Sequence, residues 1–219
     1  MSTIRRLIGS VFVLAVFGIT GCTQLVSGKA VAPNAAGSAD IENLLLDADE
    51  VNSIMDTNDL ELVESGDGPD DTIDASPSEC HGVIYISGEI EYGNTDFTEM
   101  RWEAVGSDSG SVVRSVAEFP SSSDAVAFVD DQTKAWDSCR KVTITSVSKE
   151  DGTKNQYQVR SVSAGNNKVT AVTLLADTDW QCQHLLQAVS SFVLDISACG
   201  SNISDQAETI ASKLAAKIK

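Results

Sequence analysis

The chain has 219 residues, of which 32 are acidic and 15 are basic, so its formal net charge is −17. This negative charge argues against a nucleic-acid partner, because binding to phosphates requires clustered Lys and Arg side chains. The length suffices for one domain with a hydrophobic core, and the sequence contains no nucleotide-binding, kinase or repeat signature.

Residues 1–21 have the features of a secretory signal peptide, with Arg5 and Arg6 before an apolar run. The residues Ile19-Thr20-Gly21-Cys22 resemble the lipobox of bacterial lipoproteins. An uncleaved membrane anchor is the alternative, but the small residues of this run leave its strictly apolar core too short to span about 30 Å. We therefore expect cleavage before Cys22 and acylation of that residue, with palmitate among the acyl chains. The mature chain would then be anchored to the cell membrane, facing the extracytoplasmic side.

Residues 22–39 are small, polar and nearly uncharged, which is typical of a flexible tether. A short helix is expected at 40–46, and a second follows, with Asp47 and Glu50 at capping-box spacing. Residues 64–79 combine Gly, Pro and many acids without periodicity, which predicts a solvated loop. The acids do not have the spacing of an EF-hand calcium loop.

Strand patterns begin after this loop. Residues 82–92 and 99–105 show weak ones, and residues 111–119 show a stronger one that ends at Pro120. Three later runs are joined by segments with Gly and Asn, so they predict an antiparallel meander. These runs span 141–148, 157–163 and 168–176.

Two longer helices are also predicted. Residues 121–139 have Ser121 as the expected cap and place Cys139 on the apolar face. The chain closes with an amphipathic helix that Ser204 is expected to cap. Its lysines, near the negative end of the helix, are interpreted as solvent-facing partners of the helix dipole.

Four cysteines remain after Cys22, and an even number in an exported chain indicates two disulfides with three possible pairings. Between Cys182 and Cys199 lie two β-rich halves around Ser190 and Ser191. A two-residue turn at these serines places the two cysteines opposite each other in a non-hydrogen-bonded pair, within disulfide reach. This favours Cys182 with Cys199 and, by elimination, Cys80 with Cys139. A zinc site is not supported, because the sequence has neither a C-x-x-C motif nor clustered histidines.

The sequence offers little support for an enzyme. On the cystine hairpin, His184, Asp195 and Ser197 share one face, a grouping that can look catalytic, but we interpret that face as exposed to water. The segment 106–110 imitates a nucleophile elbow with Asp108 where the serine should be. We therefore predict no catalytic residue, no metal site and no cofactor.

Several segments together resemble the PknH-like extracellular sensor domain of mycobacteria, over roughly residues 40–219. They are SEC at 78–80, VAEFPSSSDAVAFV at 116–129, WDSC at 136–139, WQCQHLLQAVSSFVLDISACG at 180–200 and QAETIASKLAAKI at 206–218. The resemblance implies an antiparallel sheet with helices packed on it, and disulfides that join the first cysteine to the second and the third to the fourth. It also implies a cleft for a small molecule or cell-wall fragment. Members of this family occur as outer parts of membrane kinases and as free-standing lipoproteins.

We therefore expect an α+β domain at 40–219 with an antiparallel sheet of about five or six strands, built as a meander plus the cystine hairpin. The expected function is that of a free-standing lipoprotein that binds an unidentified small molecule or envelope component. An envelope hydrolase and a protein-interaction module that partners a membrane kinase are the alternatives. Candidate cleft residues are Tyr85, Tyr92, Trp102, His184 and Asp195, although core packing is the favoured use of the three aromatic side chains.

Overall fold

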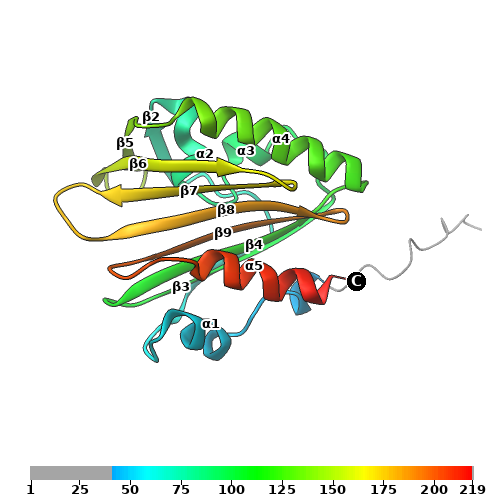
Figure 1. Ribbon diagram of the computed structural model, residues 1–219, viewed down its shortest axis with the longest axis horizontal. Coiled ribbons are helices and arrows are strands. Elements are labelled where there is room, and N and C mark those ends of the chain that lie inside the picture. The colour runs from blue at the N-terminus through cyan, green and yellow to red at the C-terminus, as the bar shows by residue number, and fades with distance from the viewer. Residues whose placement is uncertain (1–40, 219) are drawn as a thin grey trace, which may run out of the picture. The chain divides into compact units, whose positions relative to one another are not determined.

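The computed structural model describes residues 41–218, so the predicted signal peptide, Cys22 and the tether lie outside the described residues. A nine-stranded antiparallel sheet with the order β1-β3-β4-β9-β8-β7-β6-β5-β2 forms the centre of the domain (Figure 1). Its strands are β1 (Glu61–Gly66), β2 (Ile73–Ser76), β3 (Glu99–Gly106), β4 (Gly110–Glu118), β5 (Thr143–Ser148), β6 (Lys154–Ala164), β7 (Lys168–Leu175), β8 (Gln181–Val189) and β9 (Phe192–Gly200).

Helices cover both faces of this sheet. The long helix α4 (Ser122–Ser138) lies over one face, together with η2 (Ser78–Cys80), α2 (His81–Ile84) and α3 (Glu89–Tyr92). The other face carries η1 (Ile41–Asn43), α1 (Ala48–Met55) and α5 (Gln206–Lys217). Within the described residues, no helix has the length and apolarity needed to span a membrane.

The central strands β8 and β9 are buried on both faces. Leu185 and Ile196 pack in the core beneath α5, whereas the neighbouring Leu186 and Val193 pack in the core beneath α4. Because successive strand residues point to opposite faces, both sets of side chains are buried. The polar residues among them are hydrogen-bonded, as Gln183 is to Ser204 and Ala207 and His184 is to Asp195.

The predicted register of the cystine hairpin is confirmed. Val189 pairs with Phe192 and Cys182 pairs with Cys199, whose Cα atoms are 4.1 Å apart and whose sulfurs form a disulfide. Ser190 and Ser191 make the turn, and Ser190 adopts a left-handed φ of 55°. The alternation of strand pairs therefore places the two cysteines at the close separation that the sequence predicted.

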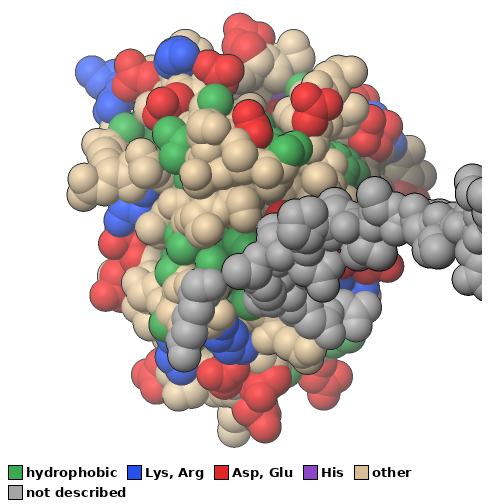
Figure 2. Space-filling model, turned by 90° about the vertical axis from the view of Figure 1, so that its right-hand side faces the viewer, with side chains coloured by type: hydrophobic (Ala, Val, Ile, Leu, Met, Phe, Trp, Pro, Cys, Tyr) green, Lys and Arg blue, Asp and Glu red, His purple; other side chains and the backbone are tan. Residues whose placement is uncertain are grey.

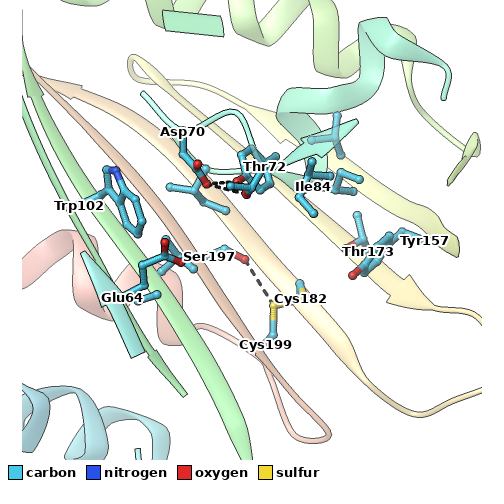
Figure 3. Close-up of a pocket in the computed structure, with 16 residues that line it drawn as sticks. Glu64, Asp70, Thr72, Ile84, Trp102, Tyr157, Thr173, Cys182, Ser197 and Cys199 are labelled. Carbon is cyan, nitrogen blue, oxygen red and sulfur yellow. Dashed lines mark hydrogen bonds between the residues drawn. A yellow bond between two sulfur atoms is a disulfide. The ribbon is translucent and has the colours of Figure 1, made fainter. Parts of the chain in front are cut away.

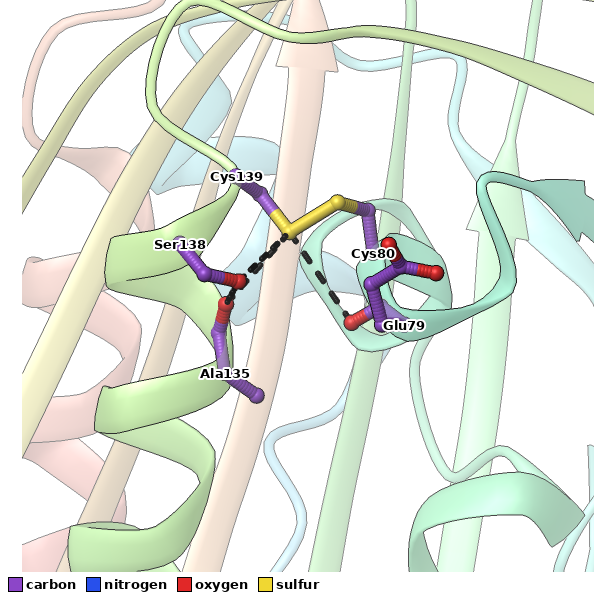
Figure 4. Close-up of a disulfide and its surroundings, with 5 residues drawn as sticks. All are labelled: Glu79, Cys80, Ala135, Ser138 and Cys139. Atoms are coloured by element: carbon purple, nitrogen blue, oxygen red, sulfur yellow. Dashed lines mark hydrogen bonds between the residues drawn. A yellow bond between two sulfur atoms is a disulfide. The ribbon is translucent and has the colours of Figure 1, made fainter.

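The second predicted disulfide, Cys80–Cys139, is also formed, with a Cα separation of 5.8 Å. It joins η2 to the end of α4, where Cys139 Sγ also lies 3.4 Å from the carbonyl oxygen of Ala135 (Figure 4). Both cysteines are buried. This bond therefore attaches the short helical segment that follows Cys80 to the long helix on the same face.

The α+β class and the antiparallel sheet are confirmed, but the expected strand count of about five or six is wrong, since the sheet has nine. Part of the difference lies at 64–79, predicted as a loop, where the end of β1 and all of β2 lie. These strands form the two edges of the sheet, and most of their side chains are exposed. An exposed edge strand needs no alternating apolar residues, so the acidic sequence of this stretch gave no sign of β1 and β2.

The weak strand predicted at 82–92 is wrong, because this segment forms the short helices α2 and α3. Between them Ser87 has a left-handed φ of 56°, and its backbone N–H donates to the buried carboxylate of Asp195 at 3.0 Å. At this point the backbone therefore hydrogen-bonds to a side chain distant in the sequence, and not to a neighbouring strand. The strand pattern at 99–105 is borne out by β3.

Two of the three predicted helix caps are confirmed. Asp47 and Glu50 form a reciprocal capping box on α1, and Ser121 Oγ accepts from the backbone N–H of Asp124 on α4. The expected cap of α5 by Ser204 is wrong. The side-chain oxygen of Gln206 instead accepts from the backbone N–H groups of Ser204 and Asp205, at 2.7 and 3.1 Å.

The lysines of α5 contact the N-terminal elements and are not free in solvent. Lys217 Nζ donates to the carbonyl oxygen of Leu45 at 3.0 Å, and Lys213 Nζ lies 3.7 Å from a carboxylate oxygen of Glu50. The interpretation as solvent-facing dipole partners is therefore incomplete. On the face in Figure 2, acidic side chains are spread between apolar and basic ones, consistent with the net charge of −17.

Candidate functional site

A cleft of about 310 Å³ opens on the face of the sheet that carries α2 (Figure 3). Its floor consists of side chains from β3, β4, β6, β7, β8 and β9. Its walls are formed by Glu64 of β1 and by two segments on either side of η2, residues 70–73 and 83–86. The volume lies at the lower end of the range for small-molecule sites, which are concave and mostly apolar.

The cystine of the β8–β9 hairpin lies in the cleft floor. Cys182 and Cys199 are both partly exposed, in contrast to the buried Cys80 and Cys139. Ser197 Oγ lies 3.5 Å from Cys199 Sγ, on the same side of β9 (Figure 3). The disulfide that sets the hairpin register therefore also forms part of the cleft surface.

Asp70, Thr72 and Tyr85 form a hydrogen-bonded group on one wall. The Thr72 hydroxyl donates to Asp70 Oδ2 at 2.9 Å, and the Tyr85 hydroxyl donates to the same oxygen. Burial raises the pKa of the Tyr85 phenol, and the hydrogen bond to Asp70 raises it further. Tyr85 therefore stays protonated and serves as a donor to the carboxylate.

Trp102 of β3 lies near Glu64 in the view of the cleft (Figure 3). Its indole Nε1 donates to the carbonyl oxygen of Gly68 at 2.9 Å. A Cβ atom on Gly66 would come within 2.7 Å of the same nitrogen, so only glycine permits this approach. The backbone after β1 thus holds the indole in place.

A buried polar cluster lies under the helical side of the cleft, centred on Asp195. Its carboxylate accepts from the backbone N–H of Ser87 at 3.0 Å and from the Tyr92 hydroxyl at 3.1 Å, and it contacts His184 Nε2 at 2.6 Å. Burial, and then the charge of Asp195, raise the pKa of Tyr92 well above its ordinary value.

The other ring nitrogen of His184, Nδ1, lies 3.1 Å from the carbonyl oxygen of Val83 in α2, and the ring packs against Trp136 of α4 with centroids 4.4 Å apart. His184 is 2% exposed and Asp195 is 3% exposed. The interpretation of this hairpin face as exposed to water is therefore wrong. Helices α2 and α4 cover it, which the local strand pattern could not reveal.

This cluster lacks the geometry of a nucleophile and its base. Ser197 is paired with His184 in the sheet register, yet both imidazole nitrogens already contact other groups, Val83 O and Asp195 Oδ1. A serine becomes a nucleophile when a base nitrogen is available to accept its proton. His184 and Asp195 therefore act here as structural partners that attach α2 to the sheet.

Of the five candidate cleft residues, the structure places only Tyr85 and Trp102 on the cleft surface. Tyr92, His184 and Asp195 form the buried cluster beneath it. The polar residues that sequence reasoning missed include Glu64, Asp70, Thr72, Tyr157, Thr173 and Ser197. Glu64 and Asp70 belong to the stretch predicted as a loop, and no local sequence pattern marks them as cleft residues. Glu64 reaches the cleft only because β1 pairs with β3 at the edge of the sheet.

The model of the PknH-like extracellular domain family matches residues 36–217 of the chain. The chain belongs to this family. It is 26% identical over 221 residues to the serine/threonine-protein kinase PknH of Mycobacterium tuberculosis, a match that covers 95% of the chain and 34% of the kinase. The PknH of Mycobacterium bovis is 26% identical over 197 residues, covering 85% of the chain and 32% of the kinase. The chain thus spans about a third of the length of these PknH relatives.

The fold is likewise similar to the crystal structure of the extracellular domain of PknH from Mycobacterium tuberculosis. The TM-score is 0.76 at 26% sequence identity, and the match covers 81% of this chain and 94% of the other. The region of PknH that this chain resembles is therefore the extracellular domain, and not the catalytic domain of the kinase.

Proposed function

We propose that this chain is a lipid-anchored envelope protein whose PknH-like domain binds a small molecule or a component of the cell envelope in the cleft beside Trp102. The observation that carries the proposal is the cleft itself, about 310 Å³ in volume, lined by apolar side chains and a few polar ones. Membership of an extracellular domain family supports a position outside the cytoplasm. Sensing or relaying a signal beside a membrane kinase is an extension of the same proposal.

The binding proposal is tested by thermal unfolding in the presence of fractionated envelope extract. A ligand at about a hundred times its Kd stabilises the folded state by about 2.7 kcal/mol, which raises the midpoint of a domain of this size by about 5 to 10 °C. Ala104→Phe, in the cleft floor, should abolish the shift by occupying the space. Gln158→Phe, on the exposed side of β6, is the control and should retain it. No shift with any fraction would contradict the proposal.

The anchoring proposal is tested by the intact mass of the protein isolated from its own membranes, with and without reduction and alkylation. The expected mass corresponds to a chain that begins at Cys22 and carries acyl groups, with four thiols that react only after reduction. A chain that retains residues 1–21 would contradict lipid anchoring. Thiols that react before reduction would contradict the exported state.

A further inference from the structure

The charged groups of the cleft all have one sign. The sixteen described residues that line it include two carboxylates, Glu64 and Asp70, and no Lys, Arg or His. Apolar side chains such as Val83 and Val113 line the cleft as well. With carboxylates as its only charged groups, the cleft disfavours an anionic group and favours a cationic one.

Three hydrogen-bond donors of the cleft are already used within the protein, whereas the hydroxyl groups of Tyr157, Thr173 and Ser197 also line it. The indole N–H of Trp102 donates to Gly68 O, and the hydroxyl groups of Thr72 and Tyr85 both donate to Asp70. A ligand that relies on accepting hydrogen bonds therefore finds these donors occupied. A ligand that donates finds two carboxylates.

Glu64 offers the more available carboxylate. It lies on the exposed edge strand β1, opposite Ala104 of β3, and the structure gives it no hydrogen bond or ion pair with another described residue. Trp102 lies near it in the view of the cleft (Figure 3). An indole ring attracts cations through the negative charge of its face, an effect that adds to that of a nearby carboxylate.

We infer that the cleft binds an organic cation, an ammonium group carried on an apolar body. The ammonium group would lie beside Glu64 and Trp102, near Asp70, and the apolar body would cover the floor around the Cys182–Cys199 disulfide. This inference rests on the proposed function, since it names the class of ligand for the same cleft.

The test compares three probes that share one carbon skeleton: phenylbutylamine, phenylbutanol and phenylbutyrate. Isothermal titration of the full chain gives the affinity for each. The amine should bind about tenfold more tightly than the alcohol, the ratio expected for one hydrogen bond to a charged group, and the carboxylate should bind most weakly. An alcohol or carboxylate that binds as tightly as the amine would overturn the inference.

Two matched variants separate the cleft from the general negative charge of the protein. Glu64→Gln and Glu61→Gln remove the same charge from the same exposed strand, but only Glu64 lines the cleft. Glu64→Gln should weaken amine binding about tenfold, and Glu61→Gln should leave it nearly unchanged. Equal losses in both variants would show diffuse attraction and overturn the inference.

Failure of the inference is distinguishable from failure of the proposed function. A thermal shift with envelope extract that Ala104→Phe abolishes, combined with no preference for the amine, would overturn the cation inference alone. No thermal shift with any extract fraction, together with no preference for the amine, would overturn both the proposed ligand binding and the cation inference.

Discussion

The pair formed by His184 and Asp195 is the most informative place to perturb this domain. The two side chains are 3% and 4% exposed and are joined at 2.6 Å. Because a carbonyl oxygen only accepts, His184 Nδ1 must donate to the carbonyl oxygen of Val83, which leaves Nε2 for the hydrogen bond with Asp195. Replacing either member leaves the other buried without its partner.

The size of the effect follows from the contacts. Removing one partner of a buried pair costs about 3 to 5 kcal/mol, so we expect His184→Leu and Asp195→Leu each to lower the free energy of unfolding by about 4 kcal/mol. The double variant leaves neither polar side chain buried without its partner, although Ser87 N–H and the Tyr92 hydroxyl still lack their acceptor. We therefore expect it to cost about 5 kcal/mol, well below the sum of the single variants.

Equilibrium unfolding in urea measures these differences, and the tryptophan fluorescence that follows it includes that of Trp136, whose indole packs on His184. The exposed pair of Lys134 and Asp131 is the control, with side chains 76% and 75% exposed. Removing that pair should leave the unfolding midpoint in place, since exposed ion pairs contribute little. Additive effects of His184→Leu and Asp195→Leu would refute the reasoning that the two act as one unit.

Two further predictions concern ionisation and reduction. Burial raises the pKa of all three tyrosines of the chain, Tyr85, Tyr92 and Tyr157. The protonated phenols therefore stabilise the fold below about pH 10, the unfolded value, and this contribution falls as the pH rises above it. Tyrosinate absorbance should appear only when the domain unfolds in alkali, and a normal titration of the folded protein near pH 10 would contradict this. In a timed reduction with alkylation and mass mapping, the partly exposed Cys182–Cys199 should react before the buried Cys80–Cys139, and the reverse order would exclude the cleft as the route of access.

The parts of the fold that the sequence predicted well are those whose cause is local. The register of β8 and β9 follows from a two-residue turn and the alternation of strand pairs, so Cys182 and Cys199 could be paired without the rest of the fold. The caps at Asp47 and Ser121 likewise depend on residues three positions apart. Each of these predictions needed only a short stretch of chain.

The incorrect predictions concern segments whose structure is set by contacts with distant parts of the chain. The segment of α2 and α3 was predicted as a strand, but Asp195 accepts the hydrogen bond of Ser87 across 108 positions of sequence. Strand β1 became visible only through its pairing with β3, because its own side chains face solvent. Two of the five predicted cleft residues, Tyr85 and Trp102, lie at the cleft surface.

The sequence by itself determined the negative charge, and it predicted the antiparallel α+β class and the Cys182–Cys199 hairpin, since composition, periodicity and turn geometry act over short distances. The Cys80–Cys139 pairing followed only by elimination. Only the tertiary structure decided which polar groups are buried and which line a cleft. His184, which was expected to face water, lies buried beneath two helices. Glu64, which was expected in a solvated loop, lines the cleft. The burial of a side chain depends on which helices pack on its face of the sheet, and that packing is determined by contacts between segments far apart in the chain.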